Sequence, residues 1–126
     1  MLGVVQTLAA AAGVVHLYIF VLESVLFTRP AVYSKVFRVS EADLAAVRPW
    51  AFNQGFYNLF RAIAVLSGTV LLRVREEAGW ALILMGCGLM AAAAIVLVAR
   101  DRGYARAATM QGTFPAPALL AGLANL

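Results

Sequence analysis

The sequence predicts an all-α integral membrane protein, built as a bundle of four transmembrane helices. Of its 126 residues, 63% are hydrophobic and 13% are charged, and the mean hydropathy of +0.88 exceeds that of ordinary soluble domains. Four apolar runs alternate with short segments that carry nine of the ten Lys and Arg residues. A transmembrane helix needs about 20 apolar residues, so four such helices use nearly the whole chain. We therefore expect a single transmembrane domain, residues 1–126.

The four expected spans cover residues 2–27, 50–72, 80–99 and 107–126. The first span ends at Arg29 and Pro30, because a charge and a helix breaker follow each other there. The third span has no charged or amide side chain, and its small residues favour close helix packing. Pro115 and Pro117 are expected to make the fourth span irregular, which a membrane helix tolerates where neighbouring groups satisfy the freed backbone.

The longest polar connection lies between the first two spans, at residues 29–49. Its segment from Ser40 to Asp43 resembles a capping box ahead of Leu44 and Val47. A short helix at the membrane interface and a solvated loop are equally compatible with this pattern.

Lysine and arginine residues are distributed unevenly among the connections, which predicts an orientation in the membrane. The first and third connections hold seven of them, and the second holds Arg73 and Arg75. The seven are Arg29, Lys35, Arg38, Arg48, Arg100, Arg102 and Arg106. Because cytoplasmic connections are enriched in basic residues, we expect these two connections in the cytoplasm and both termini on the non-cytoplasmic side. The expected location is the cell (cytoplasmic) membrane, as a multi-pass protein.

The first span carries two titratable side chains, His16 and Glu23, in the run GVVHLYIFVLESVLFT. They are seven residues apart, a spacing that returns to nearly the same face of an α-helix. A carboxyl group within a bilayer is costly unless it is neutral or partnered, so it marks a functional site by default. A lone histidine on an apolar helix is more often a packing residue, but His16 shares its stripe with Glu23. Gln6, near the outer end of the span, is expected to be solvated.

The first half of the second span is unusually polar for a membrane helix. It contains Asn53, Gln54, Tyr57, Asn58 and Arg61. Gln54, Asn58 and Arg61 follow the i, i+4, i+7 spacing of one helix face, and Tyr57 lies beside that face. The second span therefore also has a polar stripe.

Sequence position indicates depth in the membrane at about 1.5 Å per residue. On this scale Glu23, the amides of the second span and Gln111 of the fourth span fall at one level near the cytoplasmic side, as a polar layer of three helices. Arg61 and His16 lie deeper. Arg61 is thus positioned to bridge Glu23 and His16, or simply to neutralise Glu23.

The residue inventory excludes several kinds of chemistry. One histidine and one glutamate within the spans fall short of a catalytic zinc set, and the sequence has no HExxH motif, Gly-rich phosphate loop or nucleophile elbow. Cys87 is the only cysteine, which excludes an internal disulfide or thiolate cluster, and we expect it to be a small packing residue. The formal net charge of +4 fits membrane topology better than nucleic-acid binding. We expect no metal, no cofactor and no nucleic-acid partner.

Three blocks of the sequence, HLYIFVLE, NQGFYN and QGTFPA, stand at residues 16–23, 53–58 and 111–116. They resemble the pattern of a family of small four-span membrane proteins, catalogued as domain of unknown function 1304. The resemblance covers nearly the whole chain and implies four transmembrane helices without an established biochemical activity. It singles out the same polar residues as the depth estimate. Arg61 departs from the family pattern, which has an apolar residue there.

The residues support three functional hypotheses. In the first, the protein binds a small lipophilic molecule or performs acid–base chemistry on it, since a low-dielectric pocket disfavours the charged form of a carboxyl group and so suits a general acid. Glu23 and His16 would be the catalytic pair. The residues expected to hold a polar group of the substrate are Asn53, Gln54, Tyr57, Asn58, Arg61 and Gln111.

In the second hypothesis the protein is a proton-coupled transporter that acts as a homodimer, in which Glu23 exchanges a proton for a cationic substrate. A glutamate in the first of four spans is similar to small multidrug resistance transporters, by analogy only, but Arg61 would repel a cation. In the third, the protein is a structural membrane subunit whose polar layer only fixes helix packing. The lipid bilayer is the expected partner in each case.

Overall fold

The computed structural model describes residues 2–126, and every regular element in this range is a helix or a helical turn, which confirms the all-α prediction. The main helices are α1 (Leu2–Phe20), α3 (Leu44–Leu71), α4 (Glu76–Arg100), α5 (Ala105–Gly112) and α6 (Pro115–Leu123). The shorter elements are the π-helical turn η1 (Val21–Val25), helix α2 (Pro30–Tyr33) and the 3-10 turns η2 (Glu41–Asp43) and η3 (Arg102–Tyr104).

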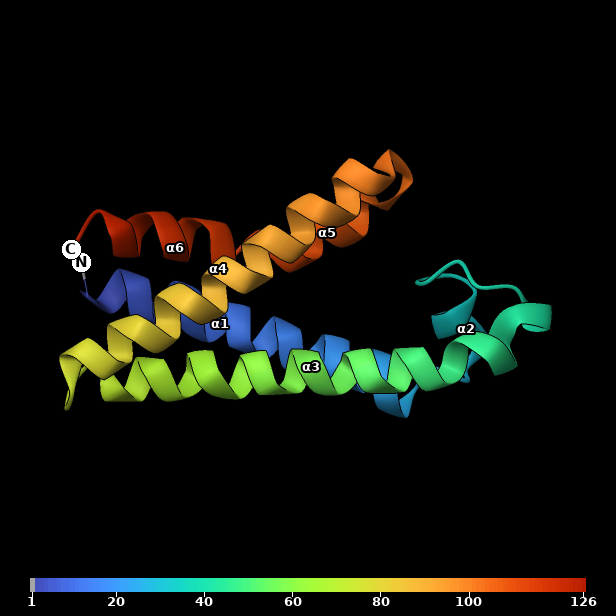
Figure 1. Ribbon diagram of the computed structural model, residues 1–126, viewed down its shortest axis with the longest axis horizontal. Helices are drawn as coiled ribbons and strands as arrows, with labels where there is room; N and C mark the ends of the chain where they lie inside the picture. The colour runs from blue at the N-terminus through green and yellow to red at the C-terminus, as the bar shows by residue number, and fades with distance from the viewer. Residues whose placement is uncertain (1) are drawn as a thin grey trace.

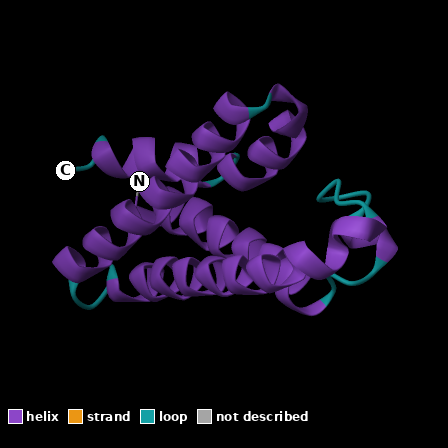
Figure 2. Cartoon of the chain, turned by 45° about the vertical axis from the view of Figure 1, so that its right-hand side comes forward, coloured by secondary structure: helices purple, strands orange, loops and turns teal. Residues whose placement is uncertain are grey.

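The molecule has two distinct ends (Figure 1). α1 and α3 lie side by side along its length, α4 crosses back from α3, and α6 packs on both α4 and α1. Both termini and the α3–α4 turn lie at one end, which we call the terminal end. The segment with α2 and the start of α3 lie at the other end, together with the α4–α5 turn, and we call this the basic end. The loops gather at these two ends, apart from the short break between α5 and α6 (Figure 2).

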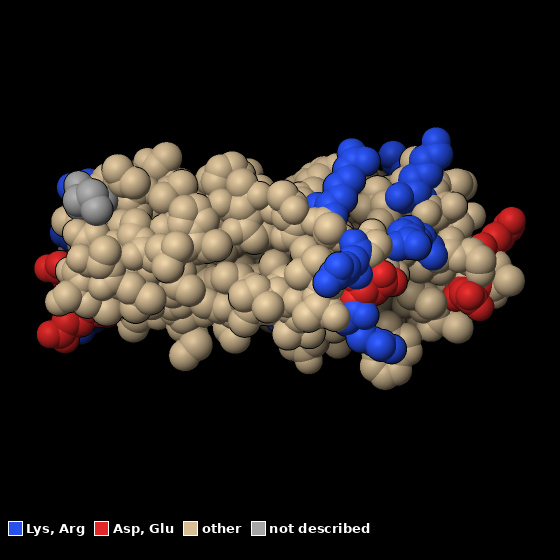
Figure 3. Space-filling view, turned by 90° about the horizontal axis from the view of Figure 1, so that it is seen from above, with Lys and Arg blue, Asp and Glu red and all other residues tan. Residues whose placement is uncertain are grey.

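Charged side chains also gather toward the two ends. On the face seen in Figure 3, the surface between the ends is nearly free of charged residues, and most of the Lys and Arg side chains lie toward the basic end. This agrees with the sequence, because the segments at the basic end contain seven of the ten basic residues. On this face the helices thus present a wide uncharged zone between two charged ends.

The main core lies between α1, α3, α4 and α6, and it is built from small and medium-sized apolar residues. Its fully or nearly buried members are Val5, Ala9, Ala12, Val65, Leu72, Ile83, Cys87, Met90 and Ala118. Glycine lets α3 and α4 approach closely: a Cβ atom on Gly86 would collide with Val65, and one on Gly79 would collide with the backbone of Leu72. Cys87 lies within this cluster as a small packing residue, as expected.

Two helices are long and apolar enough to cross a membrane, and they cover Leu2–Val25 and Glu76–Arg100. Helix α3 has 28 residues, but amides and Arg61 make it more polar than these two. The last apolar region is divided, because α5 ends at Gly112 and α6 begins at Pro115. This is the irregularity that the prolines predict. Pro115 stands at the first position of α6, where a backbone N–H would have no hydrogen-bond partner within the helix, so its absence costs nothing.

The connection between the first two expected spans is shorter than the sequence indicates. Ser40 caps the next helix, since its Oγ accepts a hydrogen bond from Asp43 N at 3.2 Å and donates one to Asp43 Oδ2 at 2.9 Å. Helix α3 then begins at Leu44 and continues through Pro49, although proline removes one backbone donor there. Residues 44–49 are therefore neither a loop nor a separate interfacial helix but the first turns of α3.

Candidate functional site

Glu23 lies on a π-helical turn at the end of α1. In this turn, η1, Leu26 N donates to Val21 O at 2.9 Å, a bond across five residues instead of the four of an α-helix. Single π-turns within α-helices are uncommon and occur frequently at functional sites. The turn also changes the angle per residue, so the spacing of an ideal α-helix does not describe how Glu23 lies relative to His16.

A chain of three polar side chains joins this turn to α3. Asn58 Nδ2 donates to Glu23 Oε1 at 2.8 Å, and Arg61 Nη1 donates to Asn58 Oδ1 at 3.2 Å. The amide thus turns its N–H toward the carboxyl group and its oxygen toward the guanidinium. Asn58 is 8% exposed, whereas Glu23 is half-buried. Arg61 therefore reaches Glu23 through the Asn58 amide, which the sequence did not predict.

Close contact between the two helices at this point depends on Gly55 and Ser24. Ser24 Oγ donates to the carbonyl of Phe52 at 2.8 Å. A Cβ atom on Gly55 would collide with the Ser24 hydroxyl and would stand 3.1 Å from Glu23 Cβ. A side chain at residue 55 would therefore have to displace the Ser24 hydroxyl for α3 to lie this close to the turn that carries Glu23. We did not identify either residue from the sequence, although Gly55 stands in the middle of the NQGFYN block.

His16 is 1% exposed, and its Nδ1 lies 2.9 Å from the carbonyl oxygen of Ala12, one helical turn earlier. This contact suits a ring with its proton on Nδ1. Within the described range 2–126, no hydrogen bond joins His16 to Glu23, Asn58 or Arg61.

The remaining predicted residues are not part of the hydrogen-bonded chain that contains Glu23. Asn53, Gln54 and Tyr57 are exposed on the outer side of α3, and Tyr57 is 50% exposed. Gln111 is half-buried on α5. Among residues 2–126, no hydrogen bond joins these four side chains to Glu23, Asn58 or Arg61.

The prediction that Gln6 is only solvated was wrong. Gln6 is half-buried at the terminal end, where its Nε2 donates to Thr69 O at 2.7 Å and its Oε1 accepts from Arg73 Nε at 2.9 Å. A residue near a helix end can reach the end of an antiparallel neighbour, and here this contact ties the start of α1 to the end of α3.

Aromatic side chains flank the Glu23 turn on the α1–α3 surface. The rings of Phe20 and Phe56 meet edge to face, with centroids 5.2 Å apart. Phe56 also contacts Phe52 and Phe60, with centroids 5.0 Å and 6.2 Å away. Phe52 and Phe60 are more than half exposed. These rings form a partly open aromatic surface on residues next to the Glu23 turn and its contact with α3.

In the part of the chain that the structure describes, no three His, Cys, Asp or Glu side chains come together as metal ligands would. The side chains that the Glu23 site itself offers are a carboxyl group that can take up or give a proton, an amide and a guanidinium.

These features define an all-helical protein with two helices capable of crossing a membrane and a polar chain between α1 and α3. The chain belongs to the family described as "Protein of unknown function (DUF1304)", whose model matches residues 10–123. No curated protein and no solved structure matches it. The matched range includes the three sequence blocks, and with them Glu23, Gly55, Asn58 and Gln111.

Proposed function

We propose that this protein is a four-span membrane protein that binds a small lipophilic molecule beside Glu23 and performs acid–base chemistry on it. The observation that carries this proposal is the chain Glu23–Asn58–Arg61, held on a π-turn where two helices meet. The chain fixes the position of a single carboxyl group, and a fixed carboxyl group in an apolar setting is what proton transfer to a lipophilic substrate requires.

Helix length and the distribution of charge both support four spans. The part of α3 from Trp50 to its C-cap Leu72 covers about 33 Å at 1.5 Å per residue. This is close to the roughly 30 Å thickness of a bilayer core. α5 and α6 together supply the fourth crossing, broken at residues 113–114. The uncharged zone between the two ends would lie in lipid, and the basic end would lie in the cytoplasm of a cell-membrane protein. The termini would then be on the outer side.

In this topology Arg61 lies near the middle of the bilayer, since it is eleven residues from both Trp50 and Leu72. An isolated charge at that depth costs about 3 kcal/mol. A carboxyl group linked to Arg61 through Asn58 would offset part of this cost. Glu23 serves as the acid or base, Asn58 and Arg61 orient it, and His16 is the second titratable group of the first span. The substrate would approach the half-buried Glu23 from the lipid side, along Phe20 and Phe56.

A second candidate function is proton-coupled transport by a homodimer, and one observation favours it. Asn53 and Gln54 are exposed on α3, and polar side chains that face lipid gain from hydrogen bonds to another helix. A second copy would supply that helix. Arg61 argues against a cationic cargo, because its fixed charge is linked to Glu23 through the Asn58 amide. In a third candidate, a structural membrane subunit, the same polar chain would serve only to hold α1 against α3.

The substitution Glu23→Gln tests the proposal. Glutamine keeps the shape and can still accept the Asn58 hydrogen bond, but it cannot transfer a proton. We expect the purified variant to assemble with a melting temperature within about 3 °C of the wild type, a shift that corresponds to less than about 1 kcal/mol. We also expect it to lose the processed form of the small lipophilic molecule that co-purifies with the wild type, measured by mass spectrometry of detergent extracts.

Glu77→Gln is the matched control, because Glu77 is exposed at the start of α4. It should leave both measurements unchanged. If Glu23→Gln instead fails to assemble, the structural function is correct. If the variant assembles and the co-purifying molecules are identical to those of the wild type, the acid–base function is wrong.

A further inference from the structure

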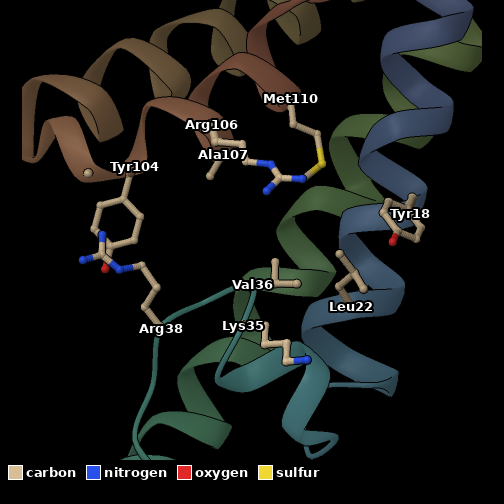
Figure 4. A pocket seen from close by; sticks show the side chains of 10 residues that line it. Tyr18, Leu22, Lys35, Val36, Arg38, Tyr104, Arg106, Ala107 and Met110 are labelled. Atoms are coloured by element: carbon tan, nitrogen blue, oxygen red, sulfur yellow. The ribbon is translucent and has the colours of Figure 1, made fainter.

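A cavity at the basic end lies apart from the Glu23 site. It has a volume of about 460 Å³ and opens between α1, the segment after α2, and the η3–α5 region (Figure 4). Its volume falls within the range of roughly 300–1,000 Å³ that is typical of small-molecule sites. Tyr18 of α1 and Leu22 of η1 line it, whereas the next residue, Glu23, contacts Asn58 of α3. None of the three functional hypotheses uses this cavity.

Three cationic side chains line the cavity, and they come from two separate parts of the chain. Lys35 and Arg38 follow α2, and Arg106 lies in the first turn of α5. In Figure 4 the Arg106 guanidinium extends toward Met110, Lys35 lies below Leu22, and Arg38 reaches the ring of Tyr104. No acidic side chain of residues 2–126 is among those that line the cavity. The three positive charges therefore share a space that has no negative charge of its own.

One carboxylate stands at the rim of the cavity. Asp101 Oδ1 accepts a hydrogen bond from Gly103 N at 2.7 Å. A Cβ atom on Gly103 would lie 2.6 Å from Arg38 Nη1 and 3.0 Å from Asp101 Oδ1, so Arg38 and Asp101 approach the same glycine. Asp101 thus offsets part of the Arg38 charge. Lys35 and Arg106 are exposed and have no such neighbour in the cavity lining.

Arg38 is held in an uncommon conformation. Its φ angle is +60°, in the left-handed region that residues other than glycine rarely adopt. Its guanidinium lies over the ring of Tyr104, 5.1 Å from the ring centroid. This contact links the segment after α2 to η3 and holds the charge at the mouth of the cavity.

The other wall of the cavity is apolar. Leu22 is nearly buried, Met110 is half-buried, and Tyr18 lies one turn of α1 before Leu22. In the proposed topology the three cations are at the level of the lipid headgroups, and this wall extends from there toward the bilayer core. A basic mouth with an apolar wall fits a molecule that has an anionic head and a hydrocarbon tail, and basic pockets between membrane helices on the cytoplasmic side bind such headgroups.

We propose that this cavity binds an anionic phospholipid from the cytoplasmic leaflet, with the phosphate group between Lys35, Arg38 and Arg106 and an acyl chain along Tyr18, Leu22 and Met110. This inference rests on the proposed membrane topology but not on the chemistry of Glu23. The two proposals can therefore fail independently, because Glu23→Gln leaves the cavity lining intact.

The test uses the full-length protein in a nonionic detergent, titrated with dioleoyl phosphatidylglycerol or dioleoyl phosphatidylcholine, with bound lipid counted by native mass spectrometry. We expect the wild type to bind phosphatidylglycerol about tenfold more tightly or better, because basic side chains attract anionic headgroups. The double variant Lys35→Gln, Arg106→Gln should lose this preference. The control, Arg75→Gln with Arg102→Gln, removes two exposed charges outside the cavity lining and should keep it. Equal binding of both lipids by the wild type, or an unchanged preference in the cavity variant, would overturn the proposal.

Two further measurements separate a lipid from a free phosphate. Inorganic phosphate at the same concentration should leave bound phosphatidylglycerol in place, and displacement would mean that the cavity is a site for free phosphate. Met110→Trp fills the apolar wall without changing the cations, so it should weaken phosphatidylglycerol binding about tenfold; unchanged binding would contradict an acyl chain there. Glu23→Gln should retain the lipid preference of the wild type, and its loss would place the lipid at the Glu23 site instead.

Discussion

Helix α3 makes close contacts with α4 and with η1, the turn that carries Glu23, but the two contacts are built from different residues. Both depend on glycine for close approach, Gly79 and Gly86 in the first contact and Gly55 in the second. The first is completed by buried apolar residues such as Val65 and Ile83. The second contains a carboxyl group, an amide and a guanidinium.

The difference bears on why the polar chain exists. Membrane helices associate through small residues and van der Waals packing, and each interhelical hydrogen bond adds only about 1 kcal/mol or less. The α3–α4 contact illustrates that this protein packs helices closely without charged groups. The presence of a polar chain at the Glu23 turn therefore supports the proposal that Glu23 has a function beyond packing.

The largest effect on stability is expected at the apolar contact. In Gly79→Ala the added Cβ atom meets the backbone of Leu72, which cannot rotate away as a side chain can. We expect a loss of about 3 kcal/mol in the free energy of unfolding, measured by denaturant titration in detergent. Gly88→Ala is the matched control in the same helix, since no atom lies within 4 Å of its added Cβ. Equal stability of the two variants would mean that α3 and α4 are not packed this closely.

A smaller loss is expected when the polar chain is cut. Asn58→Ala leaves Glu23 and Arg61 without their common partner, and an unsatisfied buried polar group costs about 1–3 kcal/mol. The variant should therefore unfold at a lower denaturant concentration than the wild type. Gln54→Ala removes an exposed amide one turn earlier and should change stability by no more than about 0.5 kcal/mol. If Asn58→Ala and Gln54→Ala lower the stability equally, Asn58 does not hold Glu23 in place.

The smallest of these effects is expected at Gly55. The Cβ atom of Gly55→Ala would meet the Ser24 hydroxyl, which can move at the expense of its hydrogen bond to Phe52 O. We expect a loss of about 1 kcal/mol. Removing the hydroxyl relieves the clash, so Ser24→Ala combined with Gly55→Ala should cost less than the sum of the two single losses. Strict additivity in this double-mutant cycle would show that the two residues do not touch.

The helical class could be predicted from the sequence, because the high apolar fraction and the charge clusters between apolar runs reflect the physical cost of burying charge. The start of α3 was missed, since Pro49 resembles a helix end and yet lies within the first turns of a longer helix. The π-turn at Val21–Val25 cannot be recognised from hydrophobic periodicity. The direction in which Glu23 points from the helix axis therefore could not be derived from the sequence.

Helix-face spacing places residues near one another, but it does not decide which of them face a neighbouring helix. Gln54 and Asn58 share a stripe, and only Asn58 is buried. The burial of Asn58 follows from Ala51, Gly55 and Ala62, the buried small residues that define the side of α3 facing its neighbours. Gly55 was the available signal, because a glycine within a helix often permits a close approach of two backbones.

The proposed role of Glu23 is tested most directly by an experimental structure of the wild-type protein in lipid nanodiscs. We expect density for a lipophilic molecule with a polar atom within hydrogen-bond distance of the Glu23 carboxyl group, entered from the lipid side beside Phe20 and Phe56. A Glu23 carboxyl group sealed between α1 and α3, with Asn58 as its only contact and protein side chains filling the surrounding space, would contradict a ligand site there.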